Sequence, residues 1–139
     1  MAHQDMETLL NEALNMASHF LEKDDEFLPF CVAMAPDGEV SQAVADTGEE
    51  QPPYEEIIDF LISEFTKGAQ DGKYKATALT ADVRIALDDA DETDAIRVTV
   101  EHVDDEPVAC YLPYQKREGK YEFGELIVEQ AERAVFPKT

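Results

Sequence analysis

The stretch ALTADVRIAL, residues 78–87, decides the fold because its hydrophobicity alternates with a period of two residues. Apolar residues occupy every second position, namely Leu79, Ala81, Val83, Ile85 and Leu87. The positions between them include Asp82 and Arg84. Since successive side chains of a strand point to opposite faces, the stretch predicts one long strand with a solvated face.

Three more strands are expected after this one, at residues 96–101, 108–114 and 121–128. A polar loop at residues 88–94 precedes them, and the turns between them are short, charged segments. Short turns connect antiparallel neighbours. The second half of the chain therefore predicts an antiparallel sheet.

Two helices and a hairpin are expected in the first half. Apolar residues at intervals of three and one predict a helix over residues 6–21, with Asp5 as its N-cap. The turn Pro36-Asp37-Gly38 separates two apolar runs and predicts a β-hairpin. A second helix follows Pro53, and its buried stripe consists of Tyr54, Ile57, Ile58, Leu61, Ile62 and Phe65.

These elements predict an α+β fold in the order α-β-β-α-β-β-β-β. We expect a mostly antiparallel sheet with both helices packed on one face. The length of 139 residues fits a single domain over residues 1–139, with frayed ends at 1–4 and 137–139. Hydrophobic residues make up 44% of the chain, enough for one core, which excludes a wholly disordered protein.

The net charge of −21 excludes several classes of partner. A chain with 32 acidic and 11 basic residues is repelled by phosphate backbones and by anionic lipid. We therefore expect neither a nucleic acid nor a membrane as partner. The N-terminus MAHQDMETLL lacks the pattern of a secretory leader, so we expect a cytoplasmic protein.

The charge is concentrated in segments. Residues 24–66 hold twelve acids and no Lys or Arg, whereas three of the basic residues crowd one predicted turn. Two interpretations stay open for the acidic segments: a solvated surface adapted to salt, or a face that binds a basic partner. The candidate partner-binding residues are Glu49, Glu50, Glu55 and Glu56, and separately Lys116, Arg117 and Lys120.

The sequence contains no motif for a metal or a cofactor, and we expect neither. The acidic stretch at 88–94 fails as a calcium loop, because an EF-hand beginning at Asp89 needs glycine at Asp94 and glutamate at Val100. Cys31 and Cys110 belong to no ligand pattern and are expected to be buried thiols. No two of the three histidines share a metal-ligand spacing.

Three functional hypotheses remain. The first is a non-enzymatic protein–protein interaction module, expected to be a homodimer, with an acidic chaperone or an immunity-type inhibitor of a basic partner as its narrower form. The second is a small-ligand binder or enzyme with a site between sheet and helices, whose candidates are His102, Cys110, Arg97 and Tyr111; burial of Cys110 would exclude a thiol mechanism. The third is a protein whose acidity reflects a salty habitat alone.

The size, low pI and helix–hairpin–helix–sheet order resemble those of the type III secretion chaperones. The same element order resembles that of the roadblock-type dimerisation domains. Both resemblances cover element order alone, and the four strands expected after the second helix depart from both families. They imply no particular site residue in this chain.

Overall fold

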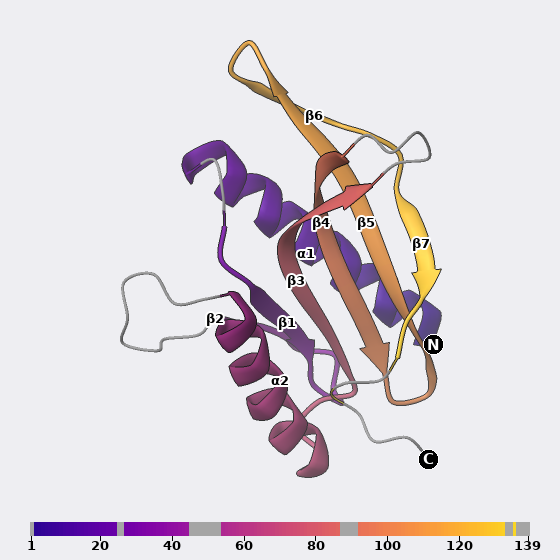
Figure 1. The fold of residues 1–139 in the computed structure, drawn as a ribbon. Helices are drawn as coiled ribbons and strands as arrows, with labels where there is room; N and C mark the ends of the chain where they lie inside the picture. Colours follow the sequence, from indigo (N-terminus) through magenta and orange to yellow (C-terminus); the bar gives the residue numbers. More distant parts are fainter. Residues whose placement is uncertain (1, 25–26, 45–53, 87–91, 133–134, 136–139) are drawn as a thin grey trace.

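The computed structural model describes residues 2–24, 27–44, 54–86, 92–132 and 135 (Figure 1). Two helices and seven strands make up the described part of the chain. In chain order they are α1 (Ala2–Asp24), β1 (Phe30–Met34), β2 (Val40–Val44), α2 (Tyr54–Gln70), β3 (Ala76–Ala86), β4 (Glu92–His102), β5 (Asp105–Arg117), β6 (Lys120–Phe123) and β7 (Ile127–Gln130).

All the strands belong to one antiparallel sheet in the order β2-β1-β3-β4-β5-β6, with β7 also paired to β5. The longest ladder joins β3 to β4, from Ala76↔His102 to Ala86↔Glu92. Strand β1 is inserted beside β3 and pairs Phe30 with Thr80. The predicted α+β class, with one antiparallel sheet and two helices packed against it, is confirmed.

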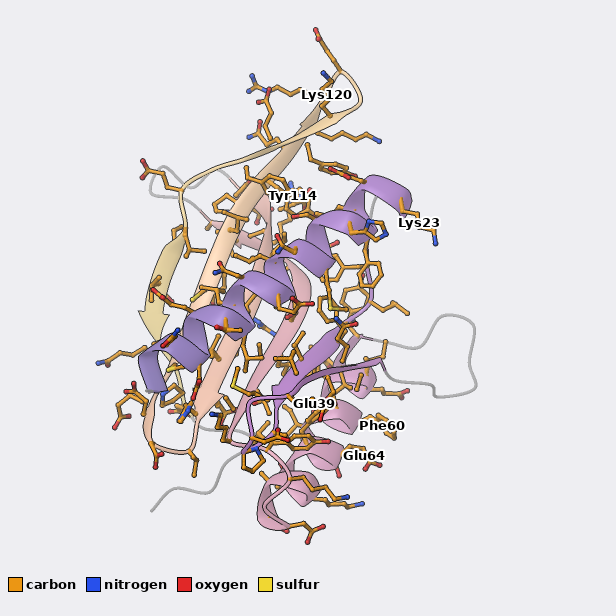
Figure 2. All side chains as sticks on the ribbon, turned by 180° about the vertical axis from the view of Figure 1, so that it is seen from behind. Lys23, Glu39, Phe60, Glu64, Tyr114 and Lys120 are labelled. Atoms are coloured by element: carbon orange, nitrogen blue, oxygen red, sulfur yellow. The ribbon has the colours of Figure 1, made fainter. Side chains whose placement is uncertain are left out.

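The two helices lie on opposite faces of the sheet, so the prediction that they share one face is wrong. In β1, Phe30, Val32 and Met34 pack in the core cluster beneath α1, whereas Cys31 and Ala33 pack beneath α2. Figure 1 shows α2 in front of the sheet and α1 behind it, and Figure 2 shows the reverse view. All five residues of β1 are buried, as a strand covered on both faces requires.

Helix α1 begins at Ala2, which places Asp5 inside the helix and not at its N-cap. The Asp5 carboxylate instead accepts a hydrogen bond from His102 Nε2 at 3.0 Å and pairs with Lys75 Nζ at 3.2 Å. The small residues Ala13 and Ala17 are fully buried on the same helix. Small side chains let a helix backbone approach the sheet closely, and the Asp5 contacts fix its first turns to β4.

The last predicted strand, residues 121–128, is two short strands in the structure. Strand β6 pairs with the end of β5 and β7 pairs with its beginning, with Pro113 between the two regions. Gly124 donates its backbone N–H to the Pro113 carbonyl at 2.8 Å. A residue of an antiparallel ladder turns its N–H and C=O toward the same neighbour, and proline has no N–H. The ladder is therefore interrupted opposite Pro113.

Candidate functional site

Two of the predicted acidic residues, Glu55 and Glu56, lie exposed in the first turn of α2. Carboxylates at this position face the positive end of the helix dipole. Glu49 and Glu50 lie outside the described residues. The acidic candidates that the structure describes are thus carried by one rigid helix whose opposite side, with Ile57, Leu61 and Phe65, is buried.

The outward side of α2 also carries an exposed aromatic ring. Phe60 is 41% exposed, although it lies in the middle of the helix. The exposed carboxylates of Glu56 and Glu64 lie one turn to either side of it, and those of Glu55 and Asp59 lie farther around the exposed half of the helix. We call these five residues the acidic face of α2; Figure 2 labels Phe60 and Glu64. Within the described part of the chain, none of the four carboxylates has an ion pair or a hydrogen bond.

Sequence reasoning missed Phe60, although a signal for it was present. At 100° per residue, Phe60 falls outside the apolar stripe of Ile57, Leu61 and Phe65 and among the acidic positions. A large apolar residue on the polar side of an amphipathic helix stands out from that pattern. The helical period alone was therefore sufficient to find it.

The basic candidates Lys116, Arg117 and Lys120 lie exposed on the hairpin that joins β5 to β6. Glu118 and Gly119 form its turn with φ of 50° and 79°, as two-residue hairpins of type I′ require. The Lys116 ammonium lies 5.6 Å from the centroid of the Tyr121 ring, and Arg117 pairs with Glu122 at 3.7 Å.

The structure keeps the acidic and basic candidates apart. Figure 2 shows Lys120 at one end of the molecule, while Phe60 and Glu64 lie toward the other end. The hairpin extends from the sheet beyond the elements that α2 contacts. The two groups of residues therefore lie in separate regions of the surface.

The four ligand-site candidates are divided between the two faces of the sheet. Cys110 is 2% exposed and lies on the α1 face, where burial raises the pKa of its thiol. His102 is also on that face; its Nδ1 accepts the Asp104 backbone N–H at 3.0 Å, which leaves the proton on Nε2 to be donated to Asp5. That hydrogen bond, with the nearby Lys75, lowers the pKa of Asp5. A buried thiol with a raised pKa is a poor nucleophile, so this environment does not favour a thiol mechanism at Cys110.

The other two candidates, Arg97 and Tyr111, are register partners on the opposite face. This face is only half-buried over β3, β4, β5 and β7, in contrast to its part beneath α2. We call it the open sheet face. Its partly exposed residues are Val83, Ile85, Arg97, Thr99, Tyr111, Pro113 and Ile127, with Glu129 exposed at the edge.

Arg97 occupies the middle of the open sheet face without an acceptor. Its side chain lies between Ala81 and Tyr111 in the register, and its Nε is buried. In the part of the chain that the structure describes, that nitrogen has no hydrogen-bond partner and the guanidinium has no ion pair. A buried donor without an acceptor costs about 1–3 kcal/mol. This arginine therefore gains from any acceptor brought to it.

Two hollows flank the sheet at the β7 side. One of about 460 Å³ adjoins the open sheet face and is lined by residues including Thr93, Pro113, Glu122 and Ile127. The other, about 360 Å³, lies on the α1 face, and its apolar lining is Met6, Leu10, Val100, Val108, Cys110 and Val128. The acidic residues Glu7, Asp105 and Glu106 also line this hollow.

Comparison of the chain with protein-family models, curated proteins and solved structures finds no match in any of the three. Neither described helix is long and apolar enough to cross a membrane. Among the described side chains, no group of three His, Cys, Asp or Glu is placed to hold a metal ion.

Proposed function

We propose that this protein is a non-enzymatic interaction module that binds a basic protein partner through the acidic face of α2. The observation that carries the proposal is Phe60, an exposed aromatic ring with a carboxylate one turn to either side, on a helix whose four exposed carboxylates lack counter-ions within the described chain. Aromatic side chains dominate binding free energy at protein interfaces, and charged rims steer association.

The electrostatic part of this proposal rests on the charge of the whole chain. A net charge of −21 attracts a cationic partner over a longer range than any single ion pair and raises the association rate. The short-range part rests on α2, whose buried stripe holds the helix against β1 and Val135. The acidic face is thereby presented on a rigid support, which reduces the entropy lost on binding.

The narrower form of the proposal is an acidic chaperone or immunity-type inhibitor, since both classes bind a basic partner by charge complementarity. The alternative of a small-ligand binder or enzyme has weaker support. Its four candidate residues lie on two faces of the sheet, and the Cys110 and His102 side chains are both buried. A homodimer and a basic partner are compatible, because they would use different surfaces.

The test is a comparison of the native complexes that four tagged proteins retain from the source cells, read by native mass spectrometry: the wild type, two α2 variants and a control. The variants are Phe60→Ala and the double variant Glu56→Lys/Glu64→Lys. The matched control is Glu22→Lys/Glu125→Lys, which changes the net charge equally at two exposed sites outside α2, on α1 and between β6 and β7. Circular dichroism checks that each variant is folded.

We expect a basic protein that is retained by the wild type and by the control and is lost from both α2 variants. Loss of an interface aromatic typically weakens binding by tenfold or more, about 2 kcal/mol. If the α2 variants retain the partner, or the control loses it equally, binding follows total charge and the assignment to α2 is wrong.

A further inference from the structure

The centre of the open sheet face carries no acid, because Glu101 is buried at one end of the face and Glu129 lies at its edge. Twelve side chains of β3, β4 and β5 point to this face at positions 79–85, 93–99 and 109–115, and none of them is Asp or Glu. The alternate positions of β3 and β4 carry Asp82, Glu92 and Asp94. In a chain with 32 acids, this is a face on which a second equally acidic molecule can approach with little local repulsion.

The exposed groups of this face have the composition of an interface. Tyr111, Val83, Ile85 and Ile127 provide half-buried apolar surface, and Arg97 provides a guanidinium without an acceptor. Tyrosine and arginine are enriched at interfaces, whereas glutamate and aspartate are depleted. The face therefore fits a protein surface that brings one carboxylate to Arg97.

The matching carboxylate is present on the same face of the same chain. Glu129 of β7 is opposite Ala109 of β5, which is opposite Thr99 of β4. Glu129 thus lies two strands away from β4, a distance of about 10 Å across the sheet. Along the strands it is displaced by two residues from Ile127, which occupies the same row as Arg97. The two side chains form no ion pair with each other, and Glu129 has no other partner among the described residues.

We propose that the open sheet face binds a second copy of this chain as a two-fold dimer, in which Arg97 pairs with Glu129 of the partner subunit. In an isologous interface, residue i contacts residue j and j contacts i. A two-fold axis that passes over β5 between Tyr111 and Ala109 brings Arg97 of each subunit opposite Glu129 of the other. Sheets pack face to face about 10 Å apart, which leaves room for both pairs.

The position of the axis explains the small residue at its centre. Ala109 is next to the axis and allows the two strands β5 to approach, while the Tyr111 rings pack beside it. The two Arg97–Glu129 pairs flank this centre, one on each side. This inference does not depend on the acidic face of α2, which lies beside the β1 side of the sheet.

The test is a charge exchange, followed by sedimentation velocity over a range of protein concentrations at physiological ionic strength. Arg97→Glu and Glu129→Arg each place like charges opposite each other, and the double variant Arg97→Glu/Glu129→Arg restores the pairs in reversed order. The matched controls are Lys23→Glu and Glu22→Arg on α1, which change the charge by the same amounts. Circular dichroism establishes that each single variant is folded.

We expect a wild-type dimer, at least a tenfold weaker dimer for each single variant, and recovery in the double variant. Both controls and Glu56→Lys/Glu64→Lys should remain dimeric. A wild-type monomer at all concentrations overturns the proposal, as does a double variant that stays monomeric. If the α2 variant alone loses the dimer, α2 is the self-association surface and the open sheet face is not.

Discussion

The strands β3, β4 and β5 have two faces that differ in burial. The α1 face is buried at its centre, where Ile96, Val98 and Val100 lie beneath the helix. The open sheet face carries alanines and threonines around the half-buried pair Arg97 and Tyr111. Burial of the α1 face stabilises the fold, and the open sheet face leaves apolar surface for a partner. Alternation along a strand separates these two tasks.

Two adjacent residues at the end of β4 show the same division on a small scale. Glu101 points to the open sheet face and accepts the Val135 backbone N–H with both carboxylate oxygens, at 3.0 and 3.1 Å. His102 points to the other face and donates to Asp5 of α1. One residue attaches the C-terminal segment and the next attaches the N-terminal helix. Each contact fixes an element to its own face of the sheet.

The largest expected contrast between the faces is in stability. Phe30→Ala removes a fully buried ring that packs against Phe20 and Phe27, with ring centroids 5.6 and 5.7 Å away. We expect a loss of about 3–5 kcal/mol in the free energy of unfolding. Tyr111→Ala on the open sheet face should cost the monomer about 1 kcal/mol or less, since its ring is not sealed by another layer.

Urea unfolding of both variants at low protein concentration measures this contrast. Low concentration is needed because dimer formation would stabilise the wild type further. A Tyr111 variant that no longer dimerises would lose this stabilisation, and its cost would then appear larger relative to that of Phe30→Ala. Equal losses for the two variants would show that the open sheet face is part of the folding core.

The next contrast concerns Glu101, whose carboxylate is 2% exposed. Glu101→Gln leaves one oxygen to accept the Val135 N–H. The second oxygen is replaced by an NH₂ group, which is itself a donor and cannot accept that N–H. We expect a loss of about 1–3 kcal/mol and faster hydrogen exchange at the Val135 amide. The matched control is Glu92→Gln, the same change at an exposed position of β4, which should cost less than about 0.5 kcal/mol. Unchanged exchange at Val135 would show that Glu101 does not hold the segment.

Periodicity was sufficient to predict most of the fold. It identified both helices, the order of elements and the antiparallel pairing. It did not place the helices, because an amphipathic stripe shows that a helix packs but not on which side of a sheet. The continuous apolar run at residues 27–35 contained the missing information, since a strand buried on both faces needs a layer on each side.

The candidate sites were less accessible from sequence. Glu55 and Glu56 were found from charge, and Phe60 was available from the helical period. The pairing of Arg97 with Glu129 of a second copy depends on β7 returning to β5, and this depends on the interruption opposite Pro113. A local pattern of alternation does not show which strand a segment will join. Tertiary register was therefore required for that inference.

The smallest expected effect lies on the α1 face and depends on pH. Because hydrogen bonds from His102 and Lys75 lower the pKa of Asp5, the folded chain binds fewer protons at this group than the unfolded chain does. Its stabilising contribution is therefore complete above the unfolded pKa of about 4 and is lost as the pH falls through the lowered folded value. Asp5→Asn should cost about 1 kcal/mol at neutral pH, and the difference from the wild type should shrink below about pH 4.

Thermal unfolding from pH 7 to pH 3 measures this difference, with Asp59→Asn as the control. Asp59 is exposed on α2 and has no ion pair within the described chain, so its removal should leave the pH profile unchanged. A constant difference between Asp5→Asn and the wild type down to pH 3 would show that the carboxylate charge contributes nothing to holding α1. The helix would then be held by its apolar side alone, and the contrast between the two faces would be one of burial without electrostatics.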